Sequence, residues 1–135
     1  MYAIVDIETT GSPANANGIT DIAIVLHDGE KLDGKYDFSF SGLKTAVLRL
    51  AQAEIGEDYT FPSIKLAERL SEAQKADIAA SFQRIAVETI VDKAKLAYEE
   101  YGPKSVVIAG GVAASPELRH QLTAALPLPI EFPDL

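Results

Sequence analysis

A short apolar run near the end of the chain, residues 105–109 (SVVIA), restricts the fold most strongly. Gly102 and Pro103 precede it and Gly110 and Gly111 follow it, and both pairs end regular structure. A strand so uniformly apolar is typical of a parallel sheet that is covered on both faces. The sequence Ser115-Pro116-Glu117 then predicts a helix start, with proline at the first helical position. This region predicts a strand–turn–helix unit of an α/β protein.

The rest of the chain changes character at about residue 40. Residues 2–7, 19–26 and 31–40 are rich in β-formers, are separated by turn residues and predict three strands. Apolar residues at helical spacing then predict one helix over residues 41–55 and a long helix from Ser71 to about residue 101. Gln74, three residues after Ser71, completes a capping box. A last strand is expected within residues 127–132.

This β-β-β-α-α-β-α-β order predicts a single α/β domain over residues 1–135, with a ribonuclease-H-like fold. We expect a five-stranded mixed sheet of order 3-2-1-4-5 with helices on its faces. The first strand should lie at the centre, antiparallel to the second strand and parallel to the fourth. Val5 is then central, and Phe82, Ile85 and Val107 are expected to be buried.

Composition and charge narrow the classes of function. The chain has 135 residues, a net charge of −8 and no cysteine, which excludes disulfides, thiolate metal sites and cysteine nucleophiles. The negative charge and the scattered Lys and Arg residues argue against strong nucleic-acid binding. No apolar run approaches the roughly 20 residues that cross a bilayer, and no signal peptide is recognisable. We therefore expect a cytoplasmic location and no membrane partner.

Two carboxylates, Asp6 and Glu8, form the first candidate site. Residues i and i+2 of a strand lie on the same face, so these side chains are expected to project side by side. Neighbouring carboxylates repel each other unless a cation lies between them, which suits half of a Mg²⁺ or Mn²⁺ site. The spacing fits equally well a strand end whose acids face solvent or cap a neighbouring helix.

The residues around these carboxylates carry a family resemblance. Residues 2–11 (YAIVDIETTG) resemble the first motif of the DnaQ-like 3′–5′ exonucleases, and residues 19–25 (ITDIAIV) are similar to that family's second strand. The resemblance covers residues 1–32 and implies that Asp6 and Glu8 hold metals that activate water against a phosphodiester. That family's remaining acidic ligands and histidine base have no counterpart, since His27 and His120 lie in the wrong context. We therefore assign no catalytic residue.

The glycine turn after residues 105–109 is the second candidate site. A buried strand, two glycines and a helix N-terminus can contact an anion or a nucleotide. From spacing alone, the simpler interpretation is a tight strand-to-helix turn. The candidate ligand contacts are Gly110, Gly111 and Ser115.

Three segments taken together resemble a second family. Residues 38–49 (FSFSGLKTAVLR), 78–83 (IAASFQ) and 108–119 (IAGGVAASPELR) are similar to successive motifs of the tRNA threonylcarbamoyladenosine transferase (TsaD) family. The resemblance runs over residues 33–135 and implies a carboxy-proximal part of an actin-like enzyme. It implies that Gly110 and Gly111 line the nucleotide side, and it places Ser115 where the family has a ligand-contacting Asn. The family's HxxxH metal motif, its further glycine-rich loop and its late aspartate ligand are missing from the sequence.

The change of resemblance between Leu32 and Asp33 falls inside the third predicted strand. The sequence therefore predicts an engineered or recombined chimera without a complete active site, rather than an enzyme. The alternatives are a metal-dependent exonuclease-like phosphodiesterase and a remnant of a TsaD-type transferase. No cofactor is assigned, and at most residual nucleotide binding and weak Mg²⁺ binding at Asp6 and Glu8 are expected. Loss of the second actin-like lobe would expose an apolar surface, so we expect a homodimer.

Overall fold

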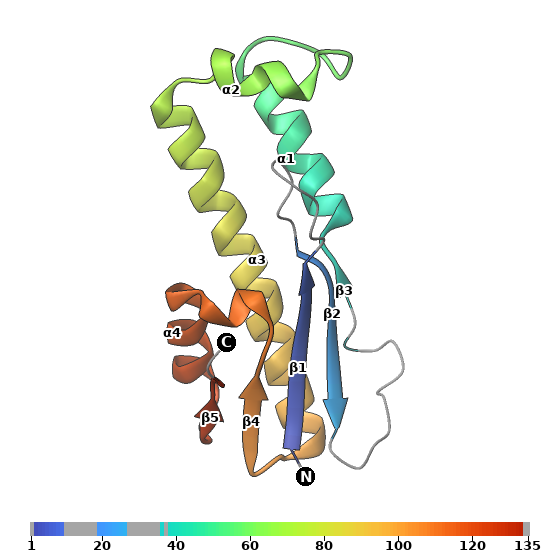
Figure 1. The fold of residues 1–135 in the computed structure, drawn as a ribbon, viewed down its shortest axis with the longest axis vertical. Helices are drawn as coiled ribbons and strands as arrows, with labels where there is room; N and C mark the ends of the chain where they lie inside the picture. Colours follow the sequence, from blue (N-terminus) through green and yellow to red (C-terminus); the bar gives the residue numbers. More distant parts are fainter. Residues whose placement is uncertain (1, 10–18, 27–35, 37, 134–135) are drawn as a thin grey trace. The chain divides into compact units, whose positions relative to one another are not determined.

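The computed structural model of the chain describes residues 2–9, 19–26, 36 and 38–133. The chain divides into two compact units, of which unit 1 comprises Met1–Phe40 and Val87–Leu135, and unit 2 comprises Ser41–Ala86. The elements, in chain order, are β1 (Tyr2–Thr9), β2 (Ile19–Leu26), β3 (Phe38–Ser39), α1 (Ser41–Glu54), the 3₁₀ helix η1 (Ser63–Lys65), α2 (Leu66–Arg69), α3 (Glu72–Tyr101), β4 (Ser105–Ile108), the 3₁₀ helix η2 (Gly111–Ala114), α4 (Pro116–Ala125) and β5 (Ile130–Glu131) (Figure 1).

The strands of unit 1 lie in the order β3-β2-β1-β4-β5. β1 pairs antiparallel with β2, with Val5 opposite Ile24, and parallel with β4, with Val5 opposite Ile108. β4 lies between β1 and β5, and this position explains why its sequence is uniformly apolar. Val106 and Ile108 are buried, whereas Val107 is only half-buried, so the prediction that Val107 is buried is wrong.

The order and pairing of the strands in unit 1 are as the sequence predicts, but the ribonuclease-H-like fold class is wrong for the chain as a whole. The described chain is mostly helical, and of the strands after residue 36 only β4 and β5 pair with each other, in parallel. Residues 41–86, all of which are described, contain no strand and form a compact unit of their own. The expectation failed because the periodicity of a helix shows which face is apolar, but not which element that face packs against.

Helix α3 has 30 residues and contributes to both units. The predicted capping box at its start is confirmed, because the N–H of Gln74 donates to Ser71 Oγ at 3.2 Å and the N–H of Ser71 donates to Gln74 Oε1 at 3.0 Å. Gly102, with φ of 52°, follows its last residue in the left-handed conformation typical of a helix end. Despite its length, neither α3 nor any other helix among the described residues is apolar enough to cross a membrane.

Burial along α3 differs between its two halves. The second half presents a buried stripe at helical spacing to the core of unit 1, formed by Val87, Ile90, Val91, Ala94 and Ala97. In the first half, Phe82 is half-buried and Ile85 is 42% exposed. The prediction that Phe82 and Ile85 are buried is therefore wrong.

The core of unit 1 joins residues that are distant in sequence. Among the side chains whose burial the structure describes, the largest fully buried ones are Tyr36, Ile90, Ile108, Leu118 and Leu122. The hydroxyl of Tyr36 donates a hydrogen bond to Glu100, and its ring meets the ring of Tyr101 edge-on with centroids 6.0 Å apart. The end of α3 is thereby tied to the segment that precedes β3.

A buried glutamine holds the loop that follows α1 in unit 2. Gln52 is 2% exposed, and its Nε2 donates to the carbonyl oxygen of Phe61 at 2.8 Å and to that of Tyr59 at 3.4 Å. Its Oε1 accepts a hydrogen bond from Arg49 Nη1 at 3.0 Å. Burying an amide is unfavourable unless its donors and acceptor find partners, and here both ends of the amide are satisfied.

Candidate functional site

The turn after β4 presents open backbone at the carboxyl end of a strand (Figure 1). Gly110 has φ of 89° and ψ of 166°, a conformation that is almost restricted to glycine. Gly111 is exposed and begins η2, and a Cβ added to Gly111 would meet no other atom within 4 Å. In α/β proteins, ligands bind beyond the carboxyl ends of the strands, where backbone of this kind can approach them closely.

Two interactions fix the position of η2. The N–H of Ala113 donates to the carbonyl oxygen of Gly110 at 3.0 Å, and Ala113 is buried. Arg119 of α4 donates from Nε to the carbonyl oxygen of Ala113 at 2.6 Å. The guanidinium of Arg119 also lies over the ring of Phe132, 4.7 Å from its centroid. Arg119 therefore links the glycine turn to the segment after β5.

Sequence reasoning assigned no role to Arg119. The only available signal was its spacing, because it follows Ser115 by four residues and so lies one helical turn further along α4. Its hydrogen bond to Ala113 bridges two elements, and no local pattern predicts such a contact.

Ser115 has a structural role in addition to its predicted contact with a ligand. It is the N-cap of α4, and its side chain accepts a hydrogen bond from the N–H of Leu118 at 3.4 Å. Pro116 occupies the first turn, as predicted, together with Glu117. The carboxylate of Glu117 opposes the positive end of the helix dipole, so this helix start is less attractive to an anion than its dipole alone suggests. Contact between Ser115 and a ligand remains a prediction.

Asp6 and Glu8 both lie in β1, two residues apart, and therefore at positions on the same face. The strand register places Asp6 opposite Ala23 and Glu8 opposite Asp21. Asp21, which sequence reasoning missed, thus shares that face with Glu8, because directly paired residues lie on one side of a sheet. The side chains of these acids lie outside the described part of the structure.

Metal binding at Asp6 and Glu8 stays a prediction. Within the part of the chain that the structure describes, no group of three or more His, Cys, Asp or Glu side chains is placed to hold a metal ion.

Comparison with known proteins identifies the family to which this strand–turn–helix unit belongs. The family of TsaD, tRNA N6-adenosine threonylcarbamoyltransferase, matches residues 3–135. Proteins of that name are 46% identical over 94 residues in Symbiobacterium thermophilum (70% of this chain, 24% of that protein) and 38% identical over 109 residues in Thermomicrobium roseum (76% and 30%). A third, from Dehalococcoides mccartyi, is 36% identical over 133 residues (98% and 36%).

The chain therefore belongs to the TsaD family. It spans between about a quarter and about a third of the length of these relatives.

The family match corrects the interpretation of residues 1–32. It begins at residue 3, and the Dehalococcoides mccartyi protein matches 98% of the chain, so both matches include the proposed junction between Leu32 and Asp33. Nothing supports a DnaQ-like exonuclease segment, and the chimera and exonuclease interpretations are withdrawn. A strand carrying two acids and followed by a turn is a short motif with few structural constraints, and it misled the sequence-based assignment.

Proposed function

We propose that this chain supplies a nucleotide-contacting turn to a tRNA N6-adenosine threonylcarbamoyltransferase. Membership of the TsaD family supports the proposal, because the relatives carry that name. The observation that carries it is the open backbone at Gly111, immediately after the positive-φ Gly110 and the carboxyl end of β4. The complete transfer reaction is assigned to proteins of the relatives' full length, and only the nucleotide contact is assigned to this chain.

The chemistry of the contact follows from the geometry of η2. The N–H groups of Gly111 and Val112 begin the 3₁₀ helix and so have no acceptor within it. Consecutive N–H groups of this kind suit the oxygens of a phosphate. The absence of a side chain at Gly111 lets those oxygens approach the backbone. Arg119 supports the turn through its bond to the carbonyl oxygen of Ala113.

The test compares two alanine variants in a titration with ATP. Gly111→Ala adds a methyl group where the ligand is proposed to approach, whereas Gly42→Ala adds one in α1, where it also meets no atom within 4 Å. We expect Gly111→Ala to raise the Kd for ATP about tenfold, equivalent to roughly one lost hydrogen bond. Gly42→Ala should leave the Kd unchanged.

Nuclear magnetic resonance provides the readout, because it detects millimolar binding and shows in the same spectra that each variant is folded. Shifts on titration should fall on β4, η2 and the first turn of α4. An absence of ATP binding to the parent chain, or equal Kd values for Gly111→Ala and Gly42→Ala, would contradict the proposal.

A further inference from the structure

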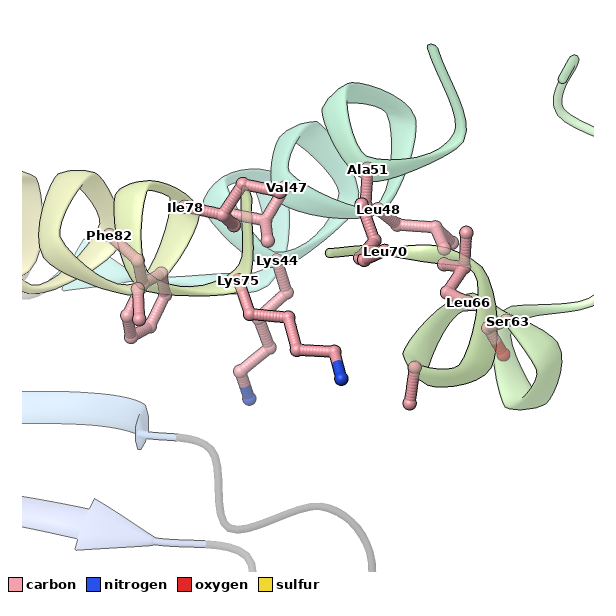
Figure 2. A pocket seen from close by; sticks show the side chains of 12 residues that line it. Lys44, Val47, Leu48, Ala51, Ser63, Leu66, Leu70, Lys75, Ile78 and Phe82 are labelled. Atoms are coloured by element: carbon pink, nitrogen blue, oxygen red, sulfur yellow. The ribbon is translucent and has the colours of Figure 1, made fainter. Parts of the chain in front are cut away.

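Unit 2 contains an apolar groove that the proposed nucleotide contact does not use. The groove lies between α1, the η1–α2 segment and the first half of α3, and its volume is about 570 Å³ (Figure 2). The apolar side chains that line it include Val47, Leu48, Leu66, Leu70, Ile78 and Phe82. We call this surface the unit 2 groove.

The unit 2 groove leaves apolar surface accessible that a helical unit normally buries. Leu66 is buried, but Leu48, Ile78 and Phe82 are only half-buried. Ile64 of η1, next to the lining residues, is 81% exposed. Apolar surface gathered in one place, rather than scattered singly, is typical of a site that binds another molecule.

Two lysines at the edge of the groove give it a charge preference. Figure 2 shows Lys44 of α1 and Lys75 of α3 extending in the same direction, away from the apolar wall. Lys75 forms an ion pair with Glu72 at 2.7 Å. Lys44 is half-buried, and its side chain has neither an ion pair nor a hydrogen bond among the described residues. The Lys44 side chain extends from the edge of the groove and has no partner among the described residues, so a carboxylate of the occupant can pair with it there.

The extent of the groove indicates the shape of its occupant. Its lining on α1 runs from Lys44 to Ala51, and its lining on α3 runs from Lys75 to Phe82. Each stretch covers a seven-residue step, or about 10 Å at 1.5 Å per residue, which corresponds to two helical turns. A third helix can bind between two such walls through apolar anchors at i, i+3 or i+4, and i+7.

We propose that the unit 2 groove binds an amphipathic α-helix of a partner protein, with apolar anchors along two turns and a carboxylate that pairs with Lys44. The proposal rests on unit 2 alone and is independent of the nucleotide-contacting turn.

A second copy of the chain fits the groove less well than an acidic helix. Two copies packed face to face through this groove around a twofold axis would bring Lys44 and Lys75 of each copy to the edge of one shared interface. The like charges of the two Lys44 side chains would then repel each other, and of the two lysines only Lys75 has a described carboxylate partner, Glu72. The homodimer expected from the sequence remains a prediction.

The experiment measures binding of the whole chain to a pair of synthetic probes by fluorescence anisotropy. The acidic probe is an alanine-based helical peptide with leucines at i, i+4 and i+7 and flanking glutamates, and its twin carries lysines instead of the glutamates. We expect Lys44→Glu to weaken the acidic probe and to strengthen the lysine probe, each about tenfold. Lys95→Glu changes the same charge at an exposed position of unit 1 and should alter neither affinity.

A second variant and two further measurements keep the proposal falsifiable. If Lys44→Glu does not fold, Lys44→Met can be used instead, because it removes the charge with little change in length. Lys44→Met should reduce the preference for the acidic probe. Chemical shifts on titration should fall on α1, α2 and the first half of α3. Equal affinity for both probes, or shifts confined to unit 1, would overturn the proposal. It would also fail if sedimentation showed a dimer that Lys44→Glu dissociates, since the occupant would then be a second copy.

Discussion

Replacing Gly110 tests the geometry of the glycine turn most directly. Its φ of 89° and ψ of 166° lie in a region where a side chain costs on the order of 1–3 kcal/mol. Gly111 has no positive φ and free space around an added Cβ, so Gly111→Ala should change stability by less than about 1 kcal/mol. We expect Gly110→Ala to lower the free energy of unfolding by about 2 kcal/mol. At roughly 2.1 cal/mol/K per residue, this corresponds to a melting temperature about 7 °C lower for 135 residues.

Gly110 lies in unit 1, so the assay should report on unit 1. Amide signals of β4 and α4, followed by nuclear magnetic resonance during urea denaturation, isolate the part of the chain that contains Gly110. Circular dichroism of the native variants checks that the helices are retained. If the Gly110→Ala and Gly111→Ala variants were equally stable, or if Gly111→Ala were the more damaging, the backbone argument for this turn would be refuted.

Three further predictions concern the core, the helix cap and one loop carboxyl. Leu122→Ala should lower the free energy of unfolding by about 2–5 kcal/mol because Leu122 is fully buried. Leu96→Ala, at a side chain that is 51% exposed, should lower it far less. Similar losses for the two variants in urea denaturation would contradict this packing. Ser115→Ala should cost about 1 kcal/mol and speed hydrogen exchange in the first turn of α4, and unchanged exchange would argue against the cap. Hydrogen bonds from the hydroxyl and N–H of Thr60 lower the pKa of Asp58 below its ordinary value of 3.8. The ionised Asp58 therefore stabilises the fold above pH 3.8, and this stabilisation is lost as the pH falls through the lowered pKa. Asp58→Asn should remove this part of the acid dependence, and identical pH profiles of stability for the variant and the parent chain would contradict the prediction.

The sequence predicts well those features whose causes lie within a few residues. The proline and serine at the start of α4, and the reciprocal bonds of Ser71 and Gln74 at the start of α3, are local, and the structure confirms them. The apolar run before Gly110 predicts β4 for the same reason. The turn, with its glycines at the end of that strand, was therefore visible as a candidate site from the sequence.

Features that depend on distant partners were not predictable. The short helices η1 and α2 were missed, since three and four residues provide too little periodicity to detect. The grouping of residues 41–86 into a compact unit depends on how the helices pack, and so does the exposure of Ile85. The side chain of Arg119 donates a hydrogen bond to the carbonyl oxygen of Ala113 in another element, and the residues next to Arg119 in the sequence do not predict this contact. The family of residues 1–32 was misassigned because a strand with two acids is compatible with more than one family.

The buried amide of Gln52 also limits how the chain can vary in length. Surface loops are ordinarily the places where a protein tolerates insertions and deletions. The loop at residues 55–62 is different, because the side chain of Gln52 donates hydrogen bonds to the carbonyl oxygens of the residues seven and nine positions further along the chain. An added or deleted residue between Gln52 and Phe61 would leave a buried amide without acceptors, so length variants of this loop should be selected against as strongly as variants of a core residue.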